Sequence, residues 1–386
     1  MHDPLAWLDD ELERLERAGL RRSLSIRSSP QAPEQIEISR GSFANFGSND
    51  YLGLAAELGN DDVIAAIHTA GWGAGASPLV TGRGSYHAKL ETELARFEGT
   101  EAALLFPTGY AANVGAVAAL AGPEDVIFSD ALNHASLIDG CRLSGARVVV
   151  YRHGDVAHLR ELLTAALPAQ RKLIVTDGLF SMDGDLAPLA DLATLAEEHL
   201  AMLLVDEAHA TGVFGKQGRG ASEHCGVEAA VHIRIGTLSK ALGSLGGFVA
   251  GQQRLIDWLT NRARTYFFST ACPEPVAAAG IAALKIVQNE PWRRSELLAR
   301  SAQLREQFRA QGWSMPEPGS QIIPLRIGDP TETMRRAQEL RAHGFLIPGI
   351  RPPSVPEGQS LLRISVSWRH DAELLNRLAA AMGNAT

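Results

Sequence analysis

Residues that mark several common classes of protein are scarce in this 386-residue chain. It has three cysteines, Cys141, Cys225 and Cys272, and none of them belongs to a CxxC pair. A disulfide framework and a zinc ribbon are therefore not supported, and we expect a reducing, cytoplasmic location. No apolar run reaches the roughly 18 residues that a membrane-spanning helix needs, so we expect no membrane partner.

An excess of basic charge is missing too. Asp and Glu number 44 against 36 Lys and Arg, which gives a formal net charge of −8. Proteins that bind nucleic acid usually carry a basic face, so we expect no nucleic-acid partner. The acidic side chains of Asp3, Asp9 and Asp10 argue against a signal peptide at the start of the chain.

Lysine is the rarest charged residue, with five lysines against 31 arginines. Lys240 differs from the other four because it follows a short apolar run, 233–236, in a glycine-rich loop that also contains Thr237 and Ser239. Desolvation lowers the pKa of a lysine and makes its amine nucleophilic, as Schiff-base chemistry requires. A solvated lysine after a strand is the alternative interpretation.

The middle of the chain alternates between helical and strand-like patterns. Helical periodicity covers 61–70, 86–98, 110–121, 134–144, 156–167, 189–199 and 275–288. Short apolar runs occur at 102–106, 126–129, 147–151, 173–176, 202–205, 233–236 and 247–250. This alternation predicts an α/β domain with a mostly parallel, helix-covered sheet. Ligands bind such sheets beyond the carboxyl ends of the strands.

The two ends of the chain have other patterns. Residues 5–20 predict an amphipathic helix, and the alternation over 37–46 predicts a hairpin or an edge strand. A long Arg/Glu-rich helix at 293–311, followed by mixed strand and helix patterns, indicates a second, smaller α+β domain. We expect an N-terminal helix and arm at 1–47, a large domain at 48–288 and a small domain at 289–386.

Asp206 and His209 follow the apolar run at 202–205. The chain has no GxxxxGK[ST] phosphate loop, so these residues are not expected to form a helicase box. His209 has no partner at metal-ligand spacing, and we expect no metal. A buried aspartate can keep a pyridine nitrogen protonated, and the pyridinium is an electron sink for a carbanion. A helix cap is the alternative for Asp206.

Three other segments carry candidate ligand groups. Gly109 opens a helix after a strand, where free N–H groups attract phosphate. His134 follows another strand and could stack on a planar ligand. Arg351 lies in a proline-rich loop, whose rigidity suits bidentate binding of a carboxylate. The respective alternatives are an ordinary turn, a histidine at a helix start and a surface arginine.

Together these segments resemble the α-oxoamine synthase family of pyridoxal-phosphate enzymes, which have the fold type I architecture. The matching blocks, in the family's order, are Asn49-Asp-Tyr-Leu-Gly53, Gly109-Tyr-Ala-Ala-Asn113, Asn133-His-Ala-Ser-Leu-Ile138, Phe180-Ser-Met-Asp-Gly184, Asp206-Glu-Ala-His-Ala-Thr-Gly212 and Thr237-Leu-Ser-Lys-Ala-Leu-Gly243. The resemblance covers nearly the whole chain. It implies a seven-stranded, mostly parallel sheet in the large domain and pyridoxal 5'-phosphate as the cofactor.

The resemblance also implies roles for single residues. Lys240 would carry the cofactor and act as a catalytic base, Asp206 would pair with the ring nitrogen, and His134 would stack on the ring. His209 and Ser181 would lie on the side of the ring hydroxyl group. The phosphate contacts implied are Gly109, Tyr110, Thr237 and, from the neighbouring subunit of a homodimer that shares its active sites, Thr270 or Ser269.

The segment Gly349-Ile-Arg-Pro-Pro-Ser-Val-Pro356 is similar to one branch of the family. That branch condenses L-alanine with a pimeloyl thioester in biotin biosynthesis. The substrate contacts it implies are Arg21, Asn49, His134, Arg351 and Ser354, of which Ser354 stands where the branch usually has threonine. Branches that use glycine or serine with other acyl thioesters, and an aminotransferase on the same fold, are the alternatives. Coenzyme A and acyl carrier protein both remain open as the acyl carrier.

Overall fold

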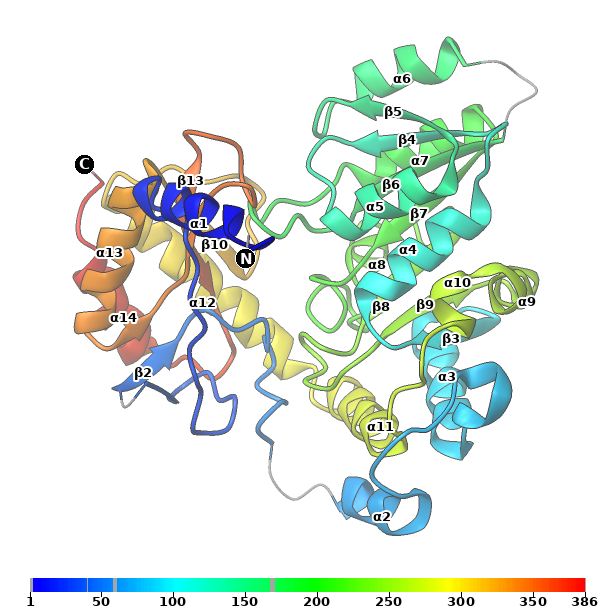
Figure 1. Cartoon of the computed structure of the whole chain (residues 1–386), viewed down its shortest axis with the longest axis horizontal. Helices are drawn as coiled ribbons and strands as arrows, with labels where there is room; N and C mark the ends of the chain where they lie inside the picture. Colours follow the sequence, from blue (N-terminus) through cyan, green and yellow to red (C-terminus); the bar gives the residue numbers. More distant parts are fainter. Residues whose placement is uncertain (1–2, 40, 58–60, 167–170, 386) are drawn as a thin grey trace. The chain divides into compact units, whose positions relative to one another are not determined.

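The computed structural model describes residues 3–39, 41–57, 61–166 and 171–385 and divides into two compact units (Figure 1). Unit 1 comprises Met1–Ser48, Met182–Gly184 and Ala299–Thr386, and unit 2 comprises Asn49–Ser181 and Asp185–Leu298. We expected residues 1–47 to form an arm of their own, but they cluster with the C-terminal residues because strands of the two segments pair. The boundary between unit 2 and the C-terminal part of unit 1 lies between Leu298 and Ala299, inside helix α12 (Trp292–Ala310). We expected this boundary after residue 288.

Unit 2 is built on a sheet of seven strands in the order β3-β9-β8-β7-β6-β4-β5. The strands are β3 (Ala102–Phe106), β4 (Val126–Asp130), β5 (Arg147–Tyr151), β6 (Lys172–Asp177), β7 (Ala201–Asp206), β8 (Ile233–Thr237) and β9 (Gly247–Gly251). The helices are α2 (Asp61–Ala70), α3 (Ser85–Glu98), α4 (Gly109–Leu120), α5 (Ala135–Ser144), α6 (Val156–Thr164), α7 (Leu189–Glu198), α8 (Ala221–His224), α9 (Gln253–Arg262), α10 (Arg264–Phe267) and α11 (Glu274–Asn289), with a π-helical turn at Pro78–Gly82.

Strand direction in this sheet follows from the connections. Strands β5, β4, β6, β7 and β8 pair in parallel, whereas β9 is antiparallel to both of its neighbours, β3 and β8. A parallel neighbour needs a crossover of about a dozen residues or more, usually a helix. Only residues 238–246 separate β8 from β9, so the chain turns back there. The predicted mostly parallel, seven-stranded sheet is confirmed, with β9 as its antiparallel strand.

An apolar core lies between the sheet and α4. Alternate residues of β8, Ile233 and Ile235, belong to the same buried cluster. Successive side chains of a strand point to opposite faces, so this spacing places both residues on one face of the sheet. Ala112, Ala116 and Val117 of α4 join the cluster. This helix face therefore packs against the sheet.

Unit 1 contains two three-stranded sheets, with the orders β1-β2-β11 and β10-β13-β12. The strands are β1 (Ile36–Ile38), β2 (Gly41–Asn45), β10 (Ile322–Gly328), β11 (Phe345–Leu346), β12 (Gly349–Ile350) and β13 (Ser360–Ser365). The helices are α1 (Trp7–Arg17), α13 (Pro330–Ala342), α14 (Ala372–Met382) and α12 from Ala299 onward. Strands β1 and β2 form an antiparallel hairpin, as predicted, and β2 also pairs in parallel with β11.

Most predicted helices and strands of the large domain end within two residues of the observed ones. The helix predicted at 156–167 is α6, which ends at Thr164, and residue 167 lies outside the described residues. Helix α9 was missed because charged and polar residues outnumber apolar ones in it, and α8 and α10 were missed because four residues are too few for a helical period to show. None of the helices in the described ranges combines the length and apolar character that crossing a membrane requires.

The start of β9 meets the start of α4 through backbone atoms. A Cβ atom added at Gly247 would lie 2.6 Å from the Cα of Gly109 and 2.6 Å from the carbonyl oxygen of Thr108. No side chain fits at such distances, so glycine is required at position 247 for packing. The contact fixes the N-terminus of α4 against the sheet.

Gly247→Ala is expected to lower the free energy of unfolding by about 1–3 kcal/mol, because overpacking forces backbone atoms apart. Gly75→Ala is the matched control, since an added Cβ there meets nothing within 4 Å. The control should change the free energy by less than about 0.5 kcal/mol. Urea unfolding followed by circular dichroism measures both variants, and equal small effects would contradict the close packing.

Candidate active site

The carboxyl ends of four neighbouring strands bring polar side chains to one edge of the unit 2 sheet. Asp130, Asp177, Asp206 and Thr237 are the last residues of β4, β6, β7 and β8, and all four are buried. Asp177 and Asp206 stand opposite each other in the parallel register. Because these strands run in the same direction, residues far apart in the sequence become neighbours at this edge, as the strand-end pattern predicts.

Two hydrogen bonds fix the carboxylate of Asp206. Its Oδ1 accepts from the backbone N–H of Ala208 at 2.8 Å, and its Oδ2 accepts from Asn113 Nδ2 at 2.6 Å. Asn113 Nδ2 also donates to Ser136 Oγ at 2.9 Å. Its Oδ1 is buried and has no hydrogen-bond partner within the described part of the chain. Sequence reasoning gave Asn113 no role, although it lies one helical turn after Gly109 on the same face of α4.

Asp177 is a second buried carboxylate beside Asp206. Burial, followed by the negative charge of Asp206, raises the pKa of Asp177 well above its usual value. Its Oδ2 accepts a hydrogen bond from the backbone N–H of His134 at 2.7 Å, which holds the start of α5 in place. Only the pairing of β6 with β7 shows that Asp177 stands opposite Asp206.

His134 lies close to the charges of Asp206 and Lys240. Its Nδ1 accepts a hydrogen bond from the backbone N–H of Ser136 and so caps α5. Partial burial lowers the pKa of His134, the carboxylate of Asp206 opposes this effect, and the ammonium group of Lys240 adds to it. The ring of Tyr110 approaches edge-on, with ring centroids 6.5 Å apart. The structure thus brings together the three residues predicted to be catalytic.

A tyrosine hydroxyl links His209 with Asn49. The Tyr51 hydroxyl lies 2.6 Å from His209 Nδ1 and donates to Asn49 Oδ1 at 3.2 Å. The side chains of Tyr51 and His209 are buried, so the imidazole has a fixed orientation. Tyr51 belongs to the Asn49–Gly53 block that carried the family resemblance, but no local pattern indicates its partner on another segment.

Lys240 lies in the tight turn between β8 and β9. Thr237 Oγ1 donates to the carbonyl oxygen of Gly246 at 2.8 Å and so ties the two ends of the turn together. The backbone N–H of Gly243 donates to the carbonyl oxygen of Lys240 at 2.9 Å. Gly243 has a φ of 61°, a left-handed conformation that strains other residues. The backbone of Lys240 is therefore held firmly, while its side chain is half-buried.

The N-terminus of α4 lies against Thr237. Thr108 caps the helix by accepting a hydrogen bond from the backbone N–H of Ala111 at 3.0 Å. A Cβ on Gly109 would lie 3.3 Å from the Cβ of Thr237, so glycine keeps the space between them open. Free N–H groups and the helix dipole make such a helix end suited to bind phosphate. Tyr110, also predicted here, is exposed, and its hydroxyl donates to Asp139.

Two further predicted cofactor contacts lie on loops of unit 2. Ser181 is half-buried in the loop after β6. Thr270 is exposed in the segment between α10 and α11, where the next residue, Ala271, donates its N–H to the carbonyl oxygen of Ala76 at 3.0 Å. An exposed hydroxyl is compatible with a contact to a neighbouring subunit, and that contact stays a prediction.

The predicted substrate contacts Arg21, Arg351 and Ser354 belong to unit 1 and not to unit 2. Arg351 donates to the carbonyl oxygen of Gly19, so the 351–354 loop contacts the residues that follow α1. The backbone N–H of Ser354 donates to the carbonyl oxygen of Arg351 at 3.1 Å, which closes this loop into a turn. Arg21 and Arg351 are thereby placed on neighbouring segments, and their role toward a substrate stays a prediction.

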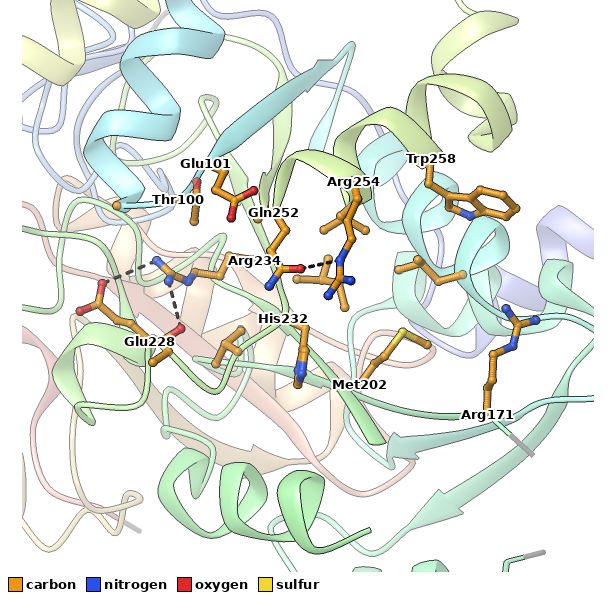
Figure 2. Close-up of a pocket in the computed structure, with 17 residues that line it drawn as sticks. Thr100, Glu101, Arg171, Met202, Glu228, His232, Arg234, Gln252, Arg254 and Trp258 are labelled. Atoms are coloured by element: carbon orange, nitrogen blue, oxygen red, sulfur yellow. Dashed lines mark hydrogen bonds and ion pairs between the residues drawn. The ribbon is translucent and has the colours of Figure 1, made fainter. Parts of the chain in front are cut away.

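A hollow of about 590 Å³ lies at the opposite edge of the unit 2 sheet (Figure 2). Met202 at the start of β7, Ile233 at the start of β8, and Arg254 and Trp258 of α9 line it, and none of the predicted site residues does. The volume of this hollow therefore does not mark it as the active site. Across the described ranges, no three His, Cys, Asp or Glu side chains are arranged to hold a metal ion.

Comparisons with known sequences agree with this arrangement. The family model of aminotransferase class I and II matches residues 42–382. An 8-amino-7-oxononanoate synthase from Anaeromyxobacter sp. (strain K) is 47% identical over 382 residues, which cover 98% of this chain and 95% of the relative. Another from Trichlorobacter lovleyi is 45% identical over 383 residues, which cover 98% and 97%.

Solved structures show the same fold. A serine palmitoyltransferase from Sphingomonas wittichii superposes with a TM-score of 0.93 at 32% identity and covers 99% of this chain and 97% of that chain. An 8-amino-7-oxononanoate synthase from Francisella tularensis gives 0.77 at 26% identity, with 88% and 96% covered. The chain therefore belongs to the aminotransferase class I and II family of pyridoxal-phosphate enzymes, in the α-oxoamine synthase group that includes the 8-amino-7-oxononanoate synthases.

Proposed function

We propose that this protein condenses L-alanine with a pimeloyl thioester, with loss of CO₂ and release of the thiol, to give 8-amino-7-oxononanoate in biotin biosynthesis. The observation that carries the enzymatic function is the buried carboxylate of Asp206 beside Lys240 and His134. The choice of substrates rests on relatives named 8-amino-7-oxononanoate synthase, which are 44–48% identical over nearly the whole chain.

The residues at the carboxyl edge of the sheet fit pyridoxal 5'-phosphate. Asp206 offers a buried anion to a ring nitrogen, and Asn113 holds that anion in place. Gly109 opens α4 beside Thr237 without a side chain, which leaves backbone N–H groups and a hydroxyl for a phosphate. Lys240 provides the amine. When bound, the cofactor supplies an electron sink for the negative charge that develops at the Cα of the amino acid.

Three side chains would orient the reaction and move its proton. Lys240 Nζ would take the α-proton of alanine as a general base, because the β8–β9 turn fixes the backbone of Lys240 beside the site. Asp206 would keep a ring nitrogen protonated, since a nearby negative charge favours the cationic form. His134, held at its backbone by Asp177, would set the plane of the ring.

We further propose that Arg351 and Asn49 bind the carboxylate of alanine and that Arg21 and Ser354 contact the pimeloyl group. Partial burial, followed by the positive charge of Arg22, lowers the pKa of Arg351. A bound anion would relieve this repulsion between guanidinium groups, and arginine suits bidentate carboxylate binding. It remains a prediction that these four residues reach the cofactor. The homodimer, whose active site Thr270 would complete, and the cytoplasmic location are predictions as well.

Thiol release tests the choice of substrates. The purified protein is incubated with pyridoxal phosphate, with alanine, glycine or serine, and with pimeloyl, acetyl, succinyl or palmitoyl thioesters of coenzyme A and acyl carrier protein. We expect alanine with a pimeloyl thioester to give a kcat/KM at least about tenfold above every other pairing, because a binding pocket separates similar acyl chains by roughly this factor or more. A faster pairing would assign another branch, and amino-group transfer without thiol release would indicate an aminotransferase.

Lys240→Ala is expected to abolish the visible absorbance band of the bound cofactor and to lower turnover by about a thousandfold or more. Lys216→Ala is the matched control, because Lys216 is an exposed lysine of a loop in the same unit. Absorbance spectra and thiol release measure both effects. Retention of the band in the Lys240 variant would remove Lys240 from its proposed role.

Asp206→Asn is expected to retain the cofactor but to slow exchange of the α-proton of alanine by roughly a hundredfold. Asparagine has one acceptor oxygen, whereas Asp206 accepts two hydrogen bonds, so the free energy of unfolding should also fall by about 1–3 kcal/mol. Deuterium exchange followed by NMR measures the first effect and urea unfolding the second. Unchanged exchange would contradict the charge-stabilising role.

A further inference from the structure

His153 lies between two carboxylates outside the residues assigned above. Its Nδ1 is 2.9 Å from Asp130 Oδ1, and its Nε2 is 3.0 Å from Asp185 Oδ2. An ionised carboxylate only accepts hydrogen bonds, so a histidine ring that binds two of them through both nitrogens is an imidazolium. Burial by itself would lower the pKa of His153, but the hydrogen bonds to Asp130 and Asp185 outweigh it and raise the pKa to about 10.

The first carboxylate belongs to the turn that carries His134. Asp130 Oδ1 also accepts from the backbone N–H of Leu132 at 2.8 Å, and Asp130 Oδ2 accepts from the backbone N–H of Gly154 at 3.0 Å. His134 lies two residues after Leu132 and is the N-cap of α5. The position of the Asp130 carboxylate therefore determines the path of the backbone into His134.

The second carboxylate belongs to the loop that carries Ser181. The carbonyl oxygen of Asp185 accepts from the backbone N–H of Phe180 at 3.0 Å, and Leu179 pairs with Leu186 in an antiparallel bridge. These bonds close a small loop with Ser181 inside it. The ring of Phe180 also packs edge-on against His153, with centroids 4.4 Å apart and planes at 84°. His153 thus contacts this loop through both an ion pair and an aromatic ring.

The charge of His153 also acts on the buried carboxylates of the site. The negative charge of Asp130 is one of the causes that raise the pKa of Asp177. An imidazolium bound to Asp130 offsets that charge, so removal of His153 would place more uncompensated negative charge beside Asp177 and Asp206. A buried charge that loses its partner is strongly unfavourable, and the loops would move to reach solvent.

We infer that His153 is a positioning residue, which holds the His134 turn and the Ser181 loop at a fixed spacing on the two sides of the cofactor site. The two ion pairs of His153 set this spacing. That the spacing matters for cofactor binding rests on the proposed function. His153 would act on the cofactor site through its contacts to Asp130 and Asp185.

His153→Gln tests the inference, because glutamine can hydrogen-bond one carboxylate but carries no charge. We expect the dissociation constant for pyridoxal phosphate to rise at least about tenfold and the circular dichroism of the bound cofactor in the visible region to change. His158→Gln is the matched control, since His158 is a similarly half-buried histidine nearby whose Nδ1 accepts the backbone N–H of Arg152 and contacts no carboxylate within the described residues. The control should leave both measurements unchanged. Wild-type affinity and spectrum in the His153 variant would overturn the inference.

A double variant and the apoprotein separate positioning from general destabilisation. The double variant His153→Gln/Asp185→Asn removes one of the two carboxylates that the single His153 variant leaves unpaired. The fold-increase in its dissociation constant for pyridoxal phosphate should therefore be smaller than the product of the fold-increases in the two single variants. Independent, multiplicative losses would overturn the inference. In the apoprotein, ¹⁵N NMR at pH 8.5 should show His153 protonated on both nitrogens, and a neutral ring would overturn it. Failure of the wild-type protein to bind pyridoxal phosphate would instead contradict the proposed function.

Discussion

The parallel pairing of β4, β6, β7 and β8 is the constraint on which the candidate site depends. It places three buried carboxylates, Asp130, Asp177 and Asp206, within one edge of a sheet. Such a concentration of negative charge away from water is unfavourable unless each group is paired, protonated or hydrogen-bonded. The molecule uses all three solutions: His153 pairs with Asp130, Asp177 has a raised pKa, and Asn113 donates to Asp206.

Backbone contacts position the elements around the lysine turn and the start of α4. Gly247 and Gly109 bring β9 and α4 together without any side chain between them. Gly243 closes the turn of Lys240 in a conformation that other residues rarely adopt. The hydroxyl of Thr237 joins the two ends of that turn. A rigid frame of this kind keeps the reactive amine and the candidate phosphate site in a constant relation.

Much of this could be predicted from the sequence, because the strong signals are local. The alternation of apolar runs with helical patterns gave the seven strands of the large domain, and Lys240 and Asp206 stand out at strand ends. The partners that fix these residues could not be predicted, since their signals are not local. Asn113 and Asp206 are 93 residues apart in the chain, and Tyr51 and His209 are 158 apart. The pairing of β2 with β11, which joins the N-terminal segment to the C-terminal one, could not be predicted for the same reason.

The division of the chain into two units assigns different tasks to different parts of the sequence. Apart from the predicted substrate contacts Arg21, Arg351 and Ser354, every predicted site residue lies in unit 2. Under the proposed function, substitutions near those three residues would alter which acyl chain or amino acid is accepted, while the buried carboxylates and the lysine turn belong to the other unit. In a family divided in this way, one unit could change its substrate preference while the other keeps the residues proposed for the electron-sink chemistry, so specificity could evolve separately from the reaction.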